Sequence, residues 1–564
     1  MKTEQPVLVI VGNPPYSGIS ANMNEWTERL LKQDMDGAQS YYKVDGQPLG
    51  EKNSKWLQDD YVKFLRFAQW KIQKSGYGIA GMITNHSYLD NPTFRGMRQS
   101  LMKTFDEIYI LDLHGNSLKR ETAPDGGKDE NVFDIRQGVA IALFVRNRKT
   151  KKPKVFHLDL YGQRNEKYRR LDSSGFDRKN YTEISPASPW YFFVPKNTDH
   201  IQHYLKWNRI DEIFPENVTG IVTARDSLAV DFEKNSLKNK IMMFRNLNLP
   251  DEVVRTGLNL KDNYQWKLAD QRKAFAQLDD WEQYFSTVLY RPFDVRHIYY
   301  HENIVFRTRY HVMHHMMEEN IGLLTCRQIA SNIWVHALVC ENLADDSLIS
   351  NKTKERTYVY PLYLYPDDSG KDMLKKRGKE RKANIADAVF AKLESVYTKK
   401  VSPEDILYYV YGIFYSNVYR KTYAEFLKTD FPRVPFTADY SIFRKIGKLG
   451  RELADLHLLK SPALNPPRAK YQGSGDNDRI EKITYSEKQH RVYISKARYF
   501  EGISPEVWNY RIGGYQVLQK YLKDRKGAIM DNAPHYCRLV TALCISLEIQ
   551  KKLDEIYPEA ERGS

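Results

Sequence analysis

The first 148 residues alternate between two hydrophobic patterns. Short runs rich in branched apolar residues predict strands, and stretches in which apolar residues recur three and four positions apart predict helices. The predicted strands are residues 7–11, 79–84, 107–113 and 138–145, and the predicted helices are residues 61–72 and 94–105. Gly76 is expected to end the first of these helices. Strands that alternate with helices are typical of an α/β sheet with crossover connections, so we predict this fold class for the N-terminal part.

After residue 149 the pattern loosens into short aromatic runs broken by Pro, Asn and Asp, which indicates a mixed α+β region. A charged stretch over residues 366–385 is typical of a solvated linker. Helical spacing returns over residues 386–427, 517–522 and 542–553. The predicted segments are therefore residues 1–158 (α/β sheet), 159–365 (mixed α+β), 366–385 (linker) and 386–564 (helical C-terminal part).

Composition favours nucleic acid as a partner without deciding it. The 564 residues carry a formal net charge of +15 and 13% aromatic residues, including 39 tyrosines. Basic side chains neutralise phosphates and aromatic faces hold unstacked bases, but basic proteins of other kinds are common. No apolar run approaches the ~18 residues that span a bilayer, and the N-terminal apolar run is too short for a secretory signal. A cytoplasmic protein without membrane contact is expected.

Metal and disulfide chemistry find little support in the sequence. The four cysteines are scattered without C-x-x-C spacing, so they are expected to be isolated buried thiols. His311, His314 and His315 lie close together, but no cysteine or carboxylate is spaced to complete a site with them. We therefore predict no metal site.

The tetrapeptide Asn13-Pro14-Pro15-Tyr16 follows the all-apolar run Val-Leu-Val-Ile-Val at residues 7–11. That run is expected to be a strand covered on both faces of its sheet, and ligands of open α/β sheets bind beyond the carboxyl ends of strands. The two prolines stiffen the loop and donate no N–H, so a backbone carbonyl and the Asn13 amide oxygen can both accept bonds from one amine. An ordinary Asn-Pro turn is the alternative interpretation.

In this position the tetrapeptide resembles the catalytic motif of DNA amino-methyltransferases. The later strands and helices of adenine-N6 enzymes with the gamma order of motifs are matched, in order, by residues 78–90, 94–101, 108–115 and 132–141. More narrowly, the chain is similar to the C-terminal part of Type ISP restriction–modification enzymes, a group often labelled predicted helicases. The segments that carry this similarity are residues 290–296, 307–311, 324–328, 423–436 and 508–518.

The resemblance implies a partial Rossmann-like methyltransferase sheet, the catalytic half, over residues 1–158, followed by a mixed α+β target-recognition region. Asn13 and the Pro14 carbonyl would bind the target amine, in a loop stiffened by Pro15, and Tyr16 would clamp a flipped adenine. Phe133 is the candidate for the second face of this clamp, although a core phenylalanine is the simpler account. The implied methyl donor is S-adenosylmethionine, and the implied partner is double-stranded DNA.

The cofactor-binding motifs of the resembled enzymes have no counterpart in this sequence. Only 12 residues precede Asn13, whereas gamma-order enzymes place these motifs upstream of the catalytic motif. Gly447, Gly450 and the pair Gly513-Gly514 do not follow a predicted buried strand, and no Walker A sequence occurs. We therefore expect the chain to depend on an upstream or separate cofactor-binding and helicase–nuclease portion. The alternative is a catalytically silent DNA specificity module for a partner helicase or nuclease.

Five arginines of the implied recognition region are the first candidates for DNA contact. They are Arg291, Arg296, Arg307, Arg309 and Arg327. Arginine either bridges guanine edges or holds phosphates, and the sequence does not separate these roles. For Arg291 and Arg296, an ion pair with the neighbouring Asp294 is the alternative.

Overall fold

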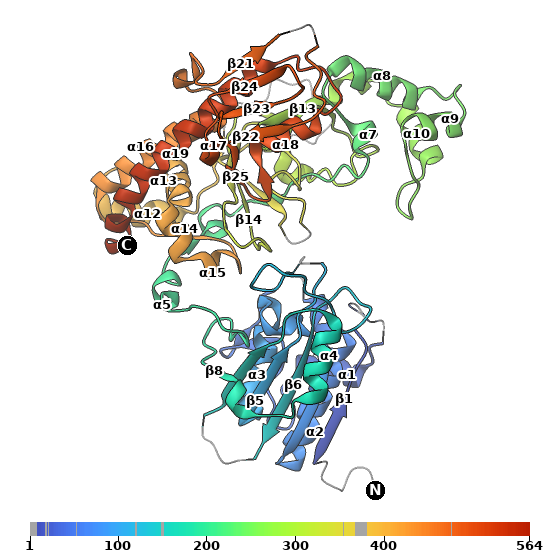
Figure 1. The fold of residues 1–564 in the computed structure, drawn as a ribbon, viewed down its shortest axis with the longest axis vertical. Coiled ribbons are helices and arrows are strands. Elements are labelled where there is room, and N and C mark those ends of the chain that lie inside the picture. The colour runs from blue at the N-terminus through green and yellow to red at the C-terminus, as the bar shows by residue number, and fades with distance from the viewer. Residues whose placement is uncertain are drawn as a thin grey trace. The chain divides into compact units, whose positions relative to one another are not determined.

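The chain folds into two compact units, which we describe separately: an N-terminal unit, Met1–Thr198, and a C-terminal unit, Asp199–Ser564 (Figure 1). The computed structural model describes residues 8–16, 18, 20, 22–51, 54–118, 121–147, 152–352, 355–366, 381–474 and 477–564.

A six-stranded mixed sheet forms the centre of the N-terminal unit. Its strands, in spatial order, are β1 (Val9–Gly12), β4 (Gly78–Asn85), β6 (Val139–Arg146), β5 (Glu107–Asp112), β7 (Lys154–Asp159) and β8 (Thr182–Ile184). β1 is parallel to β4 and β5 is parallel to β7, while β6 runs antiparallel between β4 and β5. The carboxyl ends of β1, β4, β5 and β7 therefore share one edge of the sheet. The predicted α/β class is confirmed for this unit, and the sheet continues past residue 158.

Helices cover both faces of this sheet. The elements besides the sheet are α1 (Glu25–Lys32), α2 (Asp60–Ser75), α3 (Arg95–Thr104), α4 (Arg164–Ser173), the hairpin β2 (Lys43–Val44) and β3 (Gln47–Pro48), and short 3-10 turns at Lys55–Gln58, His86–Leu89, Pro92–Phe94 and Arg178–Asn180. The larger core unites α2 and α3 with alternate residues of β4, β5 and β6. A smaller cluster on the opposite face includes Leu171 of α4. α2 ends at Gly76, whose left-handed φ of 82° confirms the predicted helix stop.

β1 corrects one expectation from the sequence. The strand was expected to be covered on both faces, but it is an edge strand that pairs only with β4 among the described residues. Val9 is 62% exposed and Val11 is 81% exposed. Val7, the first residue of the predicted run, lies outside the described residues. An apolar edge strand presents unpaired backbone N–H and C=O groups, so it is a ready site for pairing with a further strand.

Three four-stranded sheets organise the described part of the C-terminal unit. The strands of the first sheet, in spatial order, are β10 (Val218–Thr219), β17 (Thr357–Pro361), β14 (Gly322–Cys326) and β15 (Ala337–Cys340). Those of the second are β11 (Val230–Asp231), β13 (Asp294–Tyr299), β12 (Phe285–Arg291) and β16 (Leu343–Ala344). Those of the third are β21 (Lys470–Gly473), β24 (Arg498–Glu501), β23 (Arg491–Tyr493) and β22 (Thr484–Ser486). Two-stranded pairs are β9 (Asn208–Arg209) with β20 (Arg433–Val434), β18 (Tyr363–Leu364) with β19 (Lys382–Ala383), and β25 (Arg511–Ile512) with β26 (Tyr515–Gln516). The mixed α+β expectation agrees with this arrangement.

The helices of this unit form two groups that Figure 1 shows on opposite sides of its sheets. One group is α7 (Asp226–Ala229), α8 (Lys234–Arg245), α9 (Asp251–Gly257) and α10 (Leu268–Ala276). The other is α12 (Asp387–Tyr397), α13 (Pro403–Tyr415), α14 (Asn417–Thr422), α15 (Ala424–Leu427), α16 (Tyr440–His457) and α19 (Ala533–Arg562). The remaining helices are α5 (Ile201–Tyr204), α6 (Ile210–Ile213), α11 (Tyr310–Met313), α17 (Pro505–Trp508) and α18 (Val517–Asp524). The predicted helical stretches over residues 386–427, 517–522 and 542–553 are confirmed.

The predicted linker over residues 366–385 falls mostly outside the described residues, because residues 367–380 are not among them. Its end is structured: Lys382 and Ala383 form β19 and pair with β18. Arg381 stacks over the Tyr363 ring at 3.8 Å from the centroid. The predicted boundaries at 158 and 365 stay predictions. Among the described residues, no helix combines the length and apolar character needed to cross a bilayer.

Candidate active site and DNA-binding surface

The loop Asn13–Tyr16 leaves the carboxyl end of β1 with its polar atoms at the surface. Asn13 and Pro15 are exposed, Pro14 is buried and Tyr16 is half-buried. The Tyr16 hydroxyl donates a hydrogen bond of 3.1 Å to Asn13 Oδ1. An amide oxygen has two lone pairs, so Asn13 Oδ1 can hold the tyrosine and still accept a second bond. The loop thus presents a fixed acceptor at the edge of the sheet.

The Tyr16 ring is anchored by both cores of the N-terminal unit. It packs against the apolar clusters on the two faces of the sheet and meets the Tyr61 ring edge to face, with 6.3 Å between centroids. Burial raises the pKa of Tyr16 to about 12, so its phenol stays neutral and keeps its proton for the bond to Asn13. The ring is therefore held in one position.

Phe133 lies in the long connection between β5 and β6 and is half-buried. Its ring packs against the same small cluster as Tyr16, formed by Leu113, Val132, Val139 and Leu160. The Phe133 N–H donates to Asn131 Oδ1 at 2.8 Å, and its carbonyl accepts a bond of 3.0 Å from the Arg164 guanidinium. Both proposed clamp rings thus pack against one apolar cluster, and their role in binding a base stays a prediction.

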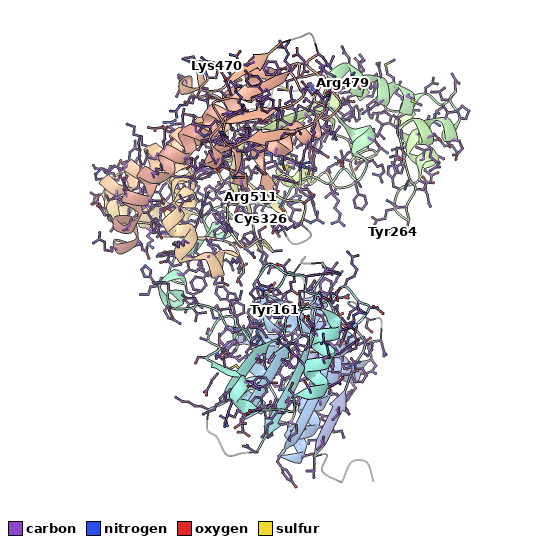
Figure 2. The ribbon with its side chains drawn as sticks, in the orientation of Figure 1. Tyr161, Tyr264, Cys326, Lys470, Arg479 and Arg511 are labelled. Atoms are coloured by element: carbon purple, nitrogen blue, oxygen red, sulfur yellow. The ribbon has the colours of Figure 1, made fainter. Side chains whose placement is uncertain are left out.

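A second group of polar side chains, which the sequence analysis missed, lines a pocket of about 250 Å³ at the carboxyl edge of the sheet. His86 follows β4, Asp112 ends β5, His114 lies two residues further on, and Asp159 ends β7. The ring of Tyr161, which Figure 2 labels, stacks on the His114 ring with 3.8 Å between centroids. The His114 ring is buried, which disfavours its charge. Hydrogen bonds to carboxylates, above all to Asp159, outweigh burial and raise the pKa of His114 to about 9. The sequence signal that could have revealed this pocket is position, because its polar residues lie at or just after the ends of β4, β5 and β7, which are far apart along the chain.

The histidines that the sequence analysis weighed have structural partners instead. His314 Nδ1 lies 2.8 Å from the Tyr310 carbonyl oxygen, and His315 Nδ1 accepts a bond of 3.1 Å from the backbone N–H of Tyr365. Neither belongs to a group of potential metal ligands within the described ranges.

Among the described residues, the loop that follows β1 does not present the groups expected of an S-adenosylmethionine site. Such a site needs a glycine-rich turn after a buried strand and a carboxylate for the ribose. The glycines considered above are elsewhere: Gly447 and Gly450 lie in α16, and Gly513 and Gly514 form the turn between β25 and β26. In the part of the chain that the structure describes, the outer edge of β1 has no neighbouring strand to carry these groups.

Three of the five candidate arginines are engaged inside the C-terminal unit. Arg291 pairs with Asp345 at 2.8 Å rather than with Asp294. Arg296 pairs with Asp294 at 2.7 Å, the alternative predicted for it, and Arg327 pairs with Asp430 at 2.8 Å. These ion pairs connect strands and loops of the unit, and the carboxylates largely neutralise the charges of the three arginines.

Arg307 and Arg309 differ from these three. Arg307 is exposed, and its guanidinium lies 5.3 Å from the centroid of the Phe306 ring without an ion pair to any described residue. Arg309 is half-buried, and its Nε has no hydrogen-bond partner among the described residues. Burial and the nearby Arg307 charge lower the pKa of Arg309. Arg307 and Arg309 are therefore the candidates among the five for binding an anion.

Solved structures place this fold among restriction–modification enzymes. The ATP-dependent Type ISP enzyme LlaBIII bound to DNA is similar with a TM-score of 0.70 and 23% identity, over 99% of this chain and 38% of that one. A nuclease-deletion mutant of the Type ISP enzyme LlaGI in complex with a DNA substrate mimic has a TM-score of 0.66 and 21% identity, over 98% of this chain and 53% of that one. The DrdV–DNA complex has a TM-score of 0.68 and 23% identity, over 98% of this chain and 57% of that one. The chain therefore spans between 38% and 57% of these relatives.

The sequence itself assigns the family. The profile of the Type ISP C-terminal specificity domain matches residues 212–541, more than half of the chain. The chain belongs to this family, and the predicted resemblance to the C-terminal region of Type ISP restriction–modification enzymes is confirmed. No curated protein matches the chain. The family match covers most of the C-terminal unit, whereas the Asn13–Tyr16 loop lies outside it.

Proposed function

We propose that this chain supplies the target-adenine site and the DNA-recognition unit of a site-specific adenine-N6 DNA methyltransferase within a Type ISP restriction–modification system. The observation that carries the proposal is the Asn13–Tyr16 loop at the carboxyl end of β1, with Asn13 Oδ1 exposed and the Tyr16 ring fixed beside it. The family match and the DNA-bound structural relatives support the recognition part.

In this proposal the loop acts on the amine of an extruded adenine. Asn13 Oδ1 and the Pro14 carbonyl accept the two N–H bonds of N6. The lone pair of that nitrogen is delocalised into the ring, so acceptors that favour a tetrahedral nitrogen stabilise the transition state more than the ground state. Tyr16 and Phe133 hold the two faces of the base after it leaves the duplex.

The methyl donor of such enzymes, S-adenosylmethionine, is assigned to a further structural element outside the described residues. The exposed outer edge of β1 supports this, because Val9 and Val11 are the apolar positions that a neighbouring strand and its helices would cover. The chain's own contribution is then to bind and orient the base.

Double-stranded DNA is the proposed partner of the C-terminal unit. Arg307 and Arg309 are its proposed phosphate or base contacts, since their donors are not consumed by ion pairs with described residues. Arg291, Arg296 and Arg327 instead hold the unit together.

The test joins the chain to the cofactor-binding portion of a Type ISP enzyme and expresses it in a bacterial host without adenine methylation of its own. Sequencing that detects N6-methyladenine should find one methylated motif with the wild type. Asn13→Ala should reduce this methylation at least a hundredfold, because removal of one preorganised transition-state partner costs about 2.7–4 kcal/mol. Equal methylation by wild type and Asn13→Ala at equal protein levels refutes the catalytic assignment.

A catalytically silent specificity module is the second candidate, favoured by the absence of a cofactor site around β1 in the described residues. It predicts specific DNA binding by the chain and no methylation from the joined protein. Micromolar binding of S-adenosylmethionine to the chain alone, measured by calorimetry, would instead contradict the assignment of the cofactor to another element.

A further inference from the structure

The pocket beyond β4, β5 and β7 is lined by three histidines, four carboxylates and one lysine. Asp90 and Lys196 belong to this lining, and the other six are His86, Asp112, His114, Glu121, His157 and Asp159. Of these six, Glu121 comes from the connection between β5 and β6, and the other five lie in or just after strands of the sheet. One ligand atom each from His86, His114 and Glu121 lies within 4.8 Å of the other two.

A neighbouring group holds one ring nitrogen of each histidine and one oxygen of Glu121. His86 Nδ1 lies 3.0 Å from Asp112 Oδ1, so it carries the proton, and the Nε2 lone pair faces the Asn116 amide nitrogen at 3.1 Å. His114 Nε2 is held in the same way by Asp159 Oδ1 at 2.8 Å, which leaves Nδ1, and a metal ion bound there would displace the second proton of this ring. One Glu121 oxygen accepts the Asn116 N–H at 2.8 Å, and its other oxygen lies 3.9 Å from His114 Nδ1.

This pattern is the outer hydrogen-bonding shell that metal-binding histidines have in proteins. A metal-ligating imidazole almost always donates its second N–H to a carboxylate, a carbonyl or a water, which fixes its tautomer and its orientation. Here both imidazoles meet a carboxylate, Asp112 for His86 and Asp159 for His114. The His86 ring is also fixed by Gly138, where a Cβ would lie 2.4 Å from His86 Nε2.

We propose that His86 Nε2, His114 Nδ1 and a Glu121 carboxylate oxygen bind a divalent transition-metal ion of the zinc class. Two imidazoles and one carboxylate are a ligand set that Zn²⁺ uses when it keeps one position open, and the pocket provides that open side. Ligand atoms around Zn²⁺ stand roughly 3.3 Å apart, so the three side chains need to close by about 1 Å. The amide nitrogen of Asn116 lies 3.1 Å from His86 Nε2, and binding of the ion would displace it from that position.

The ion would tie the β5–β6 connection to the end of β4. His86 stands at β4, whereas His114 and Glu121 belong to the connection that also carries Phe133. A metal ion bound to residues of both segments would restrict the conformations of the β5–β6 connection. The site is defined by its ligands alone, so it goes beyond the methylation proposal and does not depend on it.

The test uses the full chain after treatment with a chelator. Calorimetry with Zn²⁺ should give one ion per chain, and Co²⁺ at the same site should give visible absorption from imidazole and carboxylate coordination. Glu121→Gln should weaken Zn²⁺ binding at least tenfold, because a neutral amide is a poor ligand. This half-exposed substitution keeps an oxygen for the Asn116 N–H, so the fold should be preserved. His86→Ala should abolish binding at this site.

Asp159→Asn tests the outer shell and should weaken binding by about 10- to 100-fold, as loss of such partners does. The matched control is His490→Asn, since His490 is an exposed histidine of the C-terminal unit, and it should leave Zn²⁺ binding unchanged. Equal Zn²⁺ affinity in wild type, Glu121→Gln and His86→Ala would overturn the proposal. If Asp159→Asn abolished binding while Glu121→Gln did not weaken it, the ion would lie among Asp112, His114 and Asp159, and the assigned ligand set would be wrong.

Discussion

The two units of this protein use their polar side chains in opposite ways. In the N-terminal unit, Asn13 and His86 stand where strands end, at the surface or facing a pocket, while the sheet behind them is apolar. In the C-terminal unit, Arg291, Arg296 and Arg327 turn inward and pair with carboxylates. Asn13 and His86 are therefore candidates for function, whereas the three arginines are parts of the frame.

This difference explains why local sequence was informative in one unit and misleading in the other. A residue directly after a strand stands at the sheet edge whatever the rest of the chain does. The partner of an arginine, in contrast, comes from anywhere: Asp345 is 54 residues from Arg291, and Asp430 is 103 residues from Arg327. Substitution of Asn13 should thus affect activity, and substitution of Arg291, Arg296 or Arg327 should affect stability.

The largest stability effect is expected where α13 and α16 cross. A Cβ at Gly450 would lie 1.9 Å from the Tyr408 carbonyl oxygen, whereas a Cβ at Gly447 would make ordinary contacts near 3.8 Å. Gly450→Ala should therefore destabilise the protein by about 3 kcal/mol through forced separation of the helices. Gly447→Ala should stabilise it by up to about 1 kcal/mol through helix propensity. Urea unfolding monitored by circular dichroism measures both, and equal effects would show that the two helices are not tightly packed.

The buried His457 should make the stability of the C-terminal unit sensitive to acid. Burial and, secondarily, the Arg420 charge lower the pKa of His457 from 6.5 to about 3 in the folded state. Tyr411 Oη lies 2.6 Å from His457 Nδ1, and Ser546 Oγ lies 3.0 Å from Nε2, so the neutral ring is fully bonded. The unfolded chain then binds the extra proton below pH 6.5, and stability falls as the pH decreases from 6.5 toward 3.

This loss should amount to about 1.4 kcal/mol per pH unit for His457 alone. Other groups titrate in the same range, so the measurement is the difference between wild type and His457→Gln in unfolding free energy from pH 4.5 to 7. The difference should shrink as the pH falls. A difference independent of pH would mean that His457 is not held neutral by the fold.

The arginines provide the sharpest comparison within one unit. Arg296 pairs with Asp294 and Asp524, and its guanidinium lies 4.0 Å from the Tyr290 ring centroid, so Arg296→Ala should cost about 2 kcal/mol of stability. Arg307 has no such contacts, so Arg307→Ala should leave stability within about 0.5 kcal/mol of wild type. It should weaken DNA binding by about tenfold and lower the salt dependence by about one released ion.

Fluorescence anisotropy with duplex DNA at several salt concentrations measures the binding side of this comparison, and thermal unfolding measures the stability side. The prediction for Arg296 would be wrong if Arg296→Ala left stability unchanged and weakened DNA binding. Arg296 would then be a candidate for DNA contact again.

Periodicity and turn residues in the sequence were enough for most N-terminal elements, because α2, β4, α3, β5 and β6 each have a local signal. They did not reveal that β1 is an edge strand here, since an all-apolar run looks the same whether its neighbour is present or not. The sequence also located the Asn13–Tyr16 loop but missed the pocket of His86, His114 and Glu121. That pocket forms only when the sheet order brings β4 and β5 to either side of β6.

Exposure is another property that a single sequence does not carry, and Tyr264 illustrates it. Tyr264 is 90% exposed in the loop between α9 and α10 (Figure 2). Neighbouring residues anchor the loop: Asn263 Oδ1 accepts the N–H groups of Gln265 and Trp266, and the buried Trp266 ring lies 3.9 Å from the Arg225 guanidinium. A solvated aromatic ring on an anchored loop of a recognition unit is suited to stacking on a base or a sugar.

Tyr264→Ala should therefore weaken duplex DNA binding by about fivefold, or about 1 kcal/mol, without changing the unfolding temperature. Tyr264→Phe is the matched control and should bind like the wild type, because stacking needs the ring and not the hydroxyl. If Phe and Ala weakened binding equally, the hydroxyl rather than the ring would make the contact. If neither had an effect, Tyr264 would lie outside the DNA-binding surface.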